Sequence, residues 1–159
     1  MSGRRWAGLG LWAVAVLAGD QLAKAWVVGN LGPGKSVPLI GSVLRLTYVT
    51  NTGGAFGLLR ERGGLMVLVS LVVLGVLIFL AWRLPLGQSA LLRASYGMVL
   101  GGALSNVADR LARGHVVDYL CLRYGGRELW PDFNIGDAGI TIGLIAIVLL
   151  QMARPRERG

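Results

Sequence analysis

Two aspartates, Asp118 and Asp137, have the residue type and the surroundings for acid–base chemistry. Asp118 lies in the apolar stretch VVDYL, and Asp137 lies at the start of the last long apolar run, IGDAGITIGLIAIVLL. Two carboxyl groups at one depth in an apolar medium do not both ionise cheaply, so we expect them to share one proton. The ionised acid then takes a proton from water while the protonated acid polarises a carbonyl, as in aspartic proteases. The alternative interpretation is that both acids merely cap structural elements.

The position of Asp137 indicates which acid carries the charge. If Asn134 is the N-cap of the last helix, Asp137 occupies the third position of that helix. The N-terminal end of a helix dipole favours negative charge, so Asp137 is expected to be the ionised member of the pair. If the third and fourth helices are neighbours, their connecting loop can bring Asp118 back over this helix start.

Three further groups of polar residues lie in largely apolar surroundings. They are Asp20 and Lys24 in DQLAK, Asn51 in NTGGAFG, and Asn106, Asp109 and Arg110 in SNVADR. Ionisable groups at membrane depth are rare and are functional candidates. Each group also has a structural interpretation: an i, i+4 ion pair that neutralises itself near the membrane interface, a glycine-rich turn, and a helix cap.

The elements that must position these residues are mainly membrane helices. Of the 159 residues, 54% are hydrophobic and only 15% are charged. About 20 apolar residues are needed to cross a hydrocarbon core. We therefore expect a mainly α membrane protein, a single domain of residues 1–159 built as a four-transmembrane-helix bundle. The predicted spans are 6–28, 64–83, 90–110 and 136–153.

The first span has an alternative interpretation as a removable signal peptide. Arg4 and Arg5 precede it, but the apolar run continues into Asp20, Gln21 and Lys24 without a clear cleavage pattern. We therefore expect this helix to be retained.

Two segments between the spans predict a small extracytoplasmic β-sheet. Residues 30–62 include the β-branched stretch 43–50, which indicates a strand, and a weaker candidate at 36–40 that Pro38 restricts to a sheet edge. The loop 111–135 holds another candidate strand at 115–122.

The charge distribution favours a membrane role over nucleic-acid binding. The net charge is +8, but the basic residues are scattered and lie mostly at span ends and in loops. Basic residues at both ends of the chain predict cytoplasmic termini. His115 and Cys121 are single residues of their types, so neither a disulfide framework nor a His/Cys metal site is expected.

In combination, the motifs resemble those of the lipoprotein signal peptidase family, signal peptidase II. The resemblance rests on DQLAK, NTGGAFG, SNVADR, VVDY and FNIGD, which occur in the family's order over nearly the whole chain. Two positions depart from the family pattern: Ser105 stands where glycine is usual, and Gly136 stands where alanine is usual. We expect Gly136 to loosen the backbone that aims Asp137, so that Gly136→Ala raises activity and thermal stability.

The resemblance implies an aspartyl endopeptidase of the bacterial cytoplasmic membrane. It would remove the signal peptide from diacylglyceryl-modified prolipoproteins, cutting before the lipidated cysteine, with its active site near the extracytoplasmic face. No cofactor or metal is implied; the expected partners are these substrates and membrane lipid, and the protein is expected to be a monomer. The implied residues are catalytic Asp118 and Asp137; substrate-binding or supporting Asn51, Gly53, Ala55, Phe56, Asn106, Arg110 and Asn134; and structural Asp20, Lys24 and Asp109.

Two other classes remain alternatives. In a small proton-coupled transporter, buried acids and a lysine form a relay, which requires polar groups near the middle of the membrane. In a non-catalytic membrane scaffold, Asp118 and Asp137 only cap elements. The motifs place the polar residues at one end of the spans, which favours the peptidase.

Overall fold

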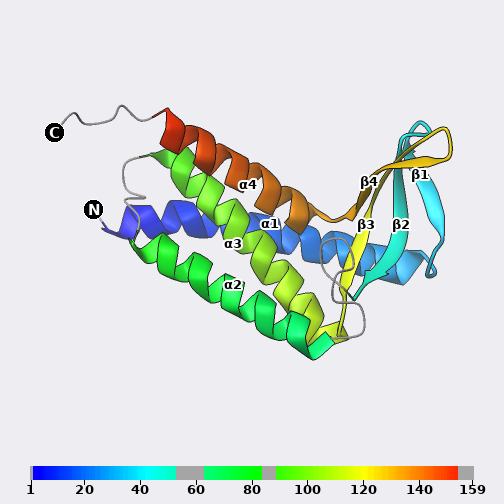
Figure 1. Cartoon of the computed structure of the whole chain (residues 1–159), viewed down its shortest axis with the longest axis horizontal. Helices are drawn as coiled ribbons and strands as arrows, with labels where there is room; N and C mark the ends of the chain where they lie inside the picture. Colours follow the sequence, from blue (N-terminus) through cyan, green and yellow to red (C-terminus); the bar gives the residue numbers. More distant parts are fainter. Residues whose placement is uncertain (1, 53–62, 84–88, 154–159) are drawn as a thin grey trace.

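The computed structural model describes residues 2–52, 63–83 and 89–153. Figure 1 shows helices packed together along most of the molecule and a β-sheet at one end. The start of α1 and the end of α4 lie at the opposite end. The helices are α1 (Ser2–Asn30), α2 (Gly63–Arg83), α3 (Ala90–Arg113) and α4 (Ile135–Met152), and the strands are β1 (Ser36–Ile40), β2 (Leu44–Asn51), β3 (Val116–Tyr124) and β4 (Arg127–Phe133).

The expected helices and small antiparallel sheet are confirmed. Within the described ranges, three helices are long and apolar enough to cross a membrane, namely Trp6–Asn30, Gly64–Arg83 and Ile135–Met152. The remaining predicted span, 90–110, lies within α3, which is the most extensively buried helix and packs against α1, α2 and α4. A helix that faces protein on several sides needs fewer apolar residues than one that faces lipid.

The bounds of α3 follow from residues at its two ends. The side chain of Ser89 accepts a hydrogen bond from the Leu92 N–H at 3.3 Å, which caps the first turn. At the other end, Gly114 has a φ of 76° and donates its backbone N–H to the Arg110 carbonyl. This left-handed conformation favours glycine and ends the helix just before β3.

Glycines bring α3 into backbone contact with its neighbours. A Cβ atom at Gly101 would lie 2.4 Å from the carbonyl oxygen of Ala13 in α1. A Cβ atom at Gly102 would lie 2.2 Å from the carbonyl oxygen of Gly136 in α4. Small residues at helix interfaces allow this close approach. As a consequence, the middle of α3 lies between α1 and the first turn of α4.

The sheet has the strand order β1-β2-β3-β4, and every neighbouring pair is antiparallel. Strands β1, β2 and β3 match the sequence-predicted strands within two residues. Strand β4 was not predicted, because RELWPDF contains Pro131 and charged residues. Among the described strands it pairs only with β3, and proline is tolerated at such an edge. On β3, Val117 and Tyr119 pack with Val27 and Leu31 in a buried cluster that joins the sheet to α1.

Candidate active site

Asp137 is held in the first turn of α4 by a reciprocal pair of hydrogen bonds with Asn134. The Asp137 N–H donates to Asn134 Oδ1 at 2.8 Å, and the Asn134 N–H donates to Asp137 Oδ2 at 3.2 Å. Asn134 is therefore the N-cap, and Asp137 occupies the third helical position, as predicted from the sequence. This capping box fixes the carboxylate against the positive end of the helix.

Asp118 reaches the same place from strand β3. Asn134 Nδ2 donates to Asp118 Oδ1 at 2.7 Å, and Asn51 Nδ2 from the end of β2 donates to Asp118 Oδ2 at 2.9 Å. Asp118 is paired with Val49 in the β2–β3 register, and its residue is only 2% exposed. Asn134 thus contacts both residues: its side-chain amide donates to the Asp118 carboxyl group, and its backbone N–H donates to the Asp137 carboxyl group.

The environment of Asp118 raises the pKa of its carboxyl group to about 7. Burial is the largest cause, because it disfavours the charged form, and the negative charge of Asp137 is the next. Hydrogen bonds from Asn51 and Asn134 oppose the rise in pKa. Asp118 therefore holds its proton close to neutral pH, as expected for one member of a proton-sharing pair.

Asn106 connects Asp137 with the buried ends of α1 and α3. Its Nδ2 atom donates to Asp137 Oδ1 at 2.7 Å. Its Oδ1 atom accepts from Lys24 Nζ at 3.0 Å and from Asn134 Nδ2 at 3.2 Å. Because a lysine can only donate, these contacts fix which end of the Asn106 amide faces Asp137.

Asp20, Lys24 and Asp109 form a fully buried ion network beneath the two acids. Lys24 Nζ lies 2.6 Å from Asp20 Oδ2 and 3.0 Å from Asp109 Oδ2, and all three side chains are 0% exposed. Asp109 also pairs with Arg113 and accepts the Val117 N–H at 3.0 Å. The structure contradicts the alternative of an isolated interfacial pair between Asp20 and Lys24, because helix packing encloses both groups.

Three residues of this network were missed in the sequence. Tyr119 donates its hydroxyl to Asp20 Oδ1 at 2.9 Å and accepts the Ile135 N–H at 3.2 Å, which ties α4 to α1. Ser105 and Gln21 also join the network around Asp20. Their adjacency to Asn106 and Asp20 in the sequence was the available signal, although a polar neighbour alone does not identify a contact.

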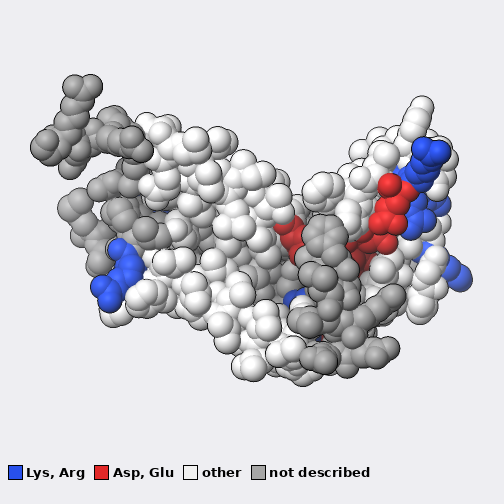
Figure 2. All heavy atoms as spheres, in the orientation of Figure 1, with Lys and Arg blue, Asp and Glu red and all other residues white. Residues whose placement is uncertain are grey.

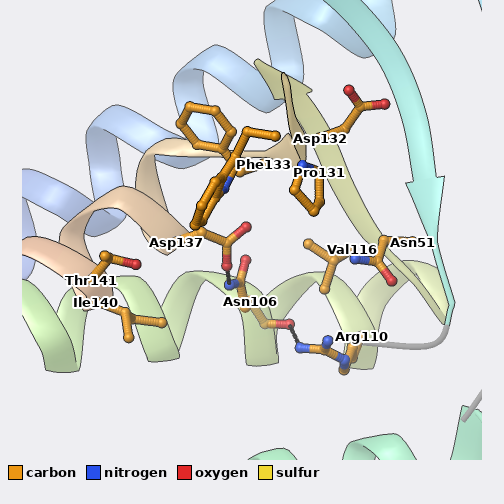
Figure 3. A pocket seen from close by; sticks show the side chains of 11 residues that line it. Asn51, Asn106, Arg110, Val116, Pro131, Asp132, Phe133, Asp137, Ile140 and Thr141 are labelled. Atoms are coloured by element: carbon orange, nitrogen blue, oxygen red, sulfur yellow. Dashed lines mark hydrogen bonds between the residues drawn. The ribbon is translucent and has the colours of Figure 1, made fainter. Parts of the chain in front are cut away.

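A cavity of about 290 Å³ opens beside Asp137. Figure 2 shows acidic atoms in the hollow between the helices and the sheet. In Figure 3, Asn106 and Asp137 point toward each other, and Arg110 follows Asn106 along α3. Arg110 Nη1 donates to the Asn106 carbonyl at 3.4 Å. Asn51 also lines the cavity. The fold therefore brings four of the predicted site residues together around this cavity, namely Asn51, Asn106, Arg110 and Asp137.

The remaining wall of the cavity is largely apolar. Trp130 and Phe133 from β4 and Ile140 from α4 contribute to it. A second pocket of about 280 Å³ shares Trp130, Phe133 and Asp137 and adds Leu122 and Ile142. Among the described residues, no three His, Cys, Asp or Glu side chains are grouped as a metal site requires. Of the predicted site residues, Gly53, Ala55 and Phe56 lie outside the described ranges.

Gly136 lies in a crowded position, which argues against the expectation that Gly136→Ala raises activity and thermal stability. A Cβ atom at this position would lie 2.9 Å from Asn134 Oδ1, 3.1 Å from Asp20 Oδ2 and 3.1 Å from the Gly102 carbonyl oxygen. A methyl group at this position would therefore require Asn134 and the neighbouring atoms to shift.

Comparison with known proteins assigns the chain to a family. Residues 12–153 match the family model described as signal peptidase (SPase) II. The chain belongs to the signal peptidase II family. A lipoprotein signal peptidase of Moorella thermoacetica is 42% identical over 149 residues, covering 94% of this chain and 95% of that protein. One from Pseudomonas aeruginosa is 36% identical over 154 residues, covering 94% and 90% of the two chains.

Solved structures agree with membership of the signal peptidase II family. A bacterial membrane enzyme determined at 2.3 Å has a TM-score of 0.77 and 28% identity, covering 94% of this chain and 92% of that one. A second, determined at 1.9 Å, has a TM-score of 0.76 and 27% identity, covering 91% and 92%. Together with the apolar helices, these relationships identify a bacterial membrane protein with a signal peptidase II function.

Proposed function

We propose that this chain is an aspartyl endopeptidase that removes the signal peptide from diacylglyceryl-modified prolipoproteins. The observation that carries the proposal is the contact of Asn134 with both Asp118 and Asp137, at distances of 2.7–3.2 Å. Asn51 and Asn106 each donate to one of the acids and line the cavity beside them. Two acids joined through Asn134, with Asp137 at the wall of a cavity, fit the activation of water for peptide hydrolysis.

In the proposed reaction, the two acids exchange protons with water and the peptide. Ionised Asp137 takes a proton from water, and the resulting hydroxyl attacks the carbonyl carbon before the lipidated cysteine. Protonated Asp118 donates its proton to the carbonyl oxygen, which gives a tetrahedral diol. When the C–N bond breaks, the proton held by Asp137 passes to the departing amine, and a diol proton returns to Asp118. The pair ends with one shared proton, as it began.

The polar site at one end of the helices supports an extracytoplasmic active site with both termini in the cytoplasm. We infer that α3 is the fourth span, enclosed by the three more apolar helices. A lipid-anchored substrate would meet the site at the membrane surface, and the apolar pocket next to Asp137 suits its apolar groups. Transport is not favoured, because the buried polar groups gather where the helices meet the sheet.

The deciding experiment is cleavage of a purified, lipidated precursor peptide by Asp118→Asn and Asp137→Asn in detergent or lipid. Each variant keeps the size of the side chain and removes its ability to exchange a proton, so we expect loss of cleavage with retained folding. Glu128→Gln is the matched control, because Glu128 is an exposed carboxylate on β4 that does not line the cavity. Wild-type cleavage by either folded aspartate variant contradicts the proposed mechanism.

A further inference from the structure

Ser105 on α3 holds one oxygen of the buried Asp20 carboxylate. Its hydroxyl donates to Asp20 Oδ2 at 2.6 Å, and Ser105 is 0% exposed. Gln21 Nε2 donates to Ser105 Oγ at 2.9 Å and to the Ser105 carbonyl at 3.1 Å. Lys24 contacts the same Asp20 oxygen from within α1. The position of Asp20 Oδ2 is therefore set by donors from two helices.

The same oxygen limits the space at Gly136 on α4. A Cβ atom at Gly136 would lie 3.1 Å from Asp20 Oδ2, which is tighter than nine in ten such contacts in proteins. It would also lie 2.9 Å from Asn134 Oδ1, the atom that accepts the Asp137 N–H. Ser105 and Gly136 thus meet at one carboxylate oxygen, one by binding it and the other by leaving room for it.

We propose that Ser105 and Gly136 are a matched pair of positioning residues that act together through Asp20. The proposal deepens the proposed function, since neither residue touches the reacting atoms. From Ser105, the path runs through Asp20 and Lys24 to Asn106, which donates to Asp137. From Gly136, it runs through Asn134 to both acids.

This arrangement predicts how the two positions depend on each other. A methyl group at position 136 meets Asn134 Oδ1 first, and with Ser105 present the neighbouring Asp20 oxygen is held in place, so the whole adjustment falls on Asn134 and the backbone. When Ser105 loses its hydroxyl, Asp20 Oδ2 keeps Lys24 as a donor but gains freedom to turn away from position 136. The damage caused by Gly136→Ala should therefore be smaller when Ser105 is alanine.

The test is a double-mutant cycle with Ser105→Ala, Gly136→Ala and the combined variant, measured with purified protein and a lipidated precursor peptide. We expect Gly136→Ala to lower kcat at least about tenfold and Ser105→Ala about threefold, with KM changed less than about twofold. The combined variant should retain kcat at least about fivefold above the product of the two separate effects. The thermal unfolding midpoint should show the same dependence.

The matched control cycle pairs Ser105→Ala with Gly19→Ala. Gly19 precedes Asp20, but a Cβ atom there has nothing within 4 Å, so its effects should multiply with those of Ser105→Ala. If Gly136→Ala does not fold, recovery of folded yield in the combined variant takes the place of kcat as the readout. Independent effects in the Ser105–Gly136 cycle, a loss expressed in KM alone, or no recovery of folding overturns the proposal. An inactive wild-type protein would refute the proposed function, whereas the thermal cycle would still test the pair.

Discussion

At the scale of single residues, Asn134 holds the site together because an amide side chain offers both a donor and an acceptor. Its Nδ2 atom serves Asp118 and Asn106, while its Oδ1 atom caps α4 through the Asp137 N–H. It is fully buried, so water does not compete for these contacts. Two roles, capping the helix and supporting the acids, therefore rest on one residue and can be separated by substitution.

We expect Asn134→Ala to lower the free energy of unfolding by about 1–2 kcal/mol from the lost cap. It should also lower kcat by about a hundredfold, because the two acids lose their common support. Asn134→Ser retains an oxygen that can cap the helix but has no amide donor for Asp118. Serine should thus recover stability without recovering kcat, as measured by denaturant titration and peptide cleavage. Parallel recovery of both quantities would contradict the division of roles.

The raised pKa of Asp118 predicts a fall in kcat above about pH 7. The proton donor is the protonated form, so activity should decrease about tenfold per pH unit on the alkaline side. Asn51→Leu removes a hydrogen bond that favours ionised Asp118 and should move this decline to higher pH, besides lowering kcat. Cleavage rates of a lipidated peptide across this pH range test both points. An unmoved alkaline limb, or a shift to lower pH, contradicts the role of Asp118.

The same pKa has a consequence for stability. The folded protein keeps a proton on Asp118 up to about pH 7, whereas an unfolded aspartate loses it near pH 4. The contribution of Asp118 to the free energy of unfolding should therefore fall as pH rises from about 4 to 7 and remain level above that. In Asp118→Asn this part of the pH dependence should be missing from denaturant titrations.

At the scale of elements, the buried ion network joins α1 to the end of α3 and, through the Val117 N–H, to strand β3. One lysine serves two aspartates, and Asp109 has Arg113 as a second cation. The two negative and two positive charges of the network therefore cancel only when all four side chains are present.

We expect Lys24→Met to lower the free energy of unfolding by about 3–5 kcal/mol, because it leaves buried carboxylates without their cation. The double variant Asp20→Asn/Lys24→Met removes one charge of each sign and leaves Asp109 paired with Arg113. It should be more stable than Lys24→Met alone in denaturant titrations of the detergent-solubilised protein. Equal losses in the single and double variants would contradict the charge-balance explanation.

At the scale of the whole molecule, the cavity lies where the helices meet the sheet, next to an apolar pocket. Residues on β4 form part of both walls, so the sheet shapes the site as well as covering it. This placement suits a substrate held at the membrane surface by its own acyl chains.

We expect an unlipidated precursor peptide to be cleaved with kcat/KM at least about a hundredfold lower than the lipidated form. Each buried methylene of an acyl chain contributes about 0.8 kcal/mol to membrane binding, so the unlipidated peptide loses its anchor. The kcat/KM values for substrates with two different acyl-chain lengths should lie between these two extremes and should rise with chain length. Equal cleavage of lipidated and unlipidated peptides would contradict the proposed substrate.

Cysteine labelling tests the proposed orientation. Cys121 is fully buried, so Glu128→Cys and Ala90→Cys introduce the exposed thiols for labelling. A membrane-impermeant maleimide should label position 128 in intact cells and position 90 only after permeabilisation. Residue 128 lies in β4, whereas residue 90 begins α3, at the end of the helices away from the sheet. The reverse pattern would invert the topology.

The sequence by itself determined the apolar helices, three of the four strands in the described residues and the N-cap that positions Asp137. These features follow from local rules, namely apolar length, β-branched composition and capping chemistry within a few residues. It also placed the site residues in recognisable motifs. Strand β4 escaped prediction because pairing with β3, and not local preference, makes RELWPDF a strand.

Only the tertiary structure decided which of these residues touch. Ser105 and Tyr119 meet Asp20 from sequence distances of 85 and 99 residues, and no local pattern encodes such contacts. The close approach of α3 and α4 reverses the expected effect of alanine at Gly136, because available space depends on the backbone of a neighbouring helix. The pKa of Asp118 likewise depends on burial and on a charge brought near by folding.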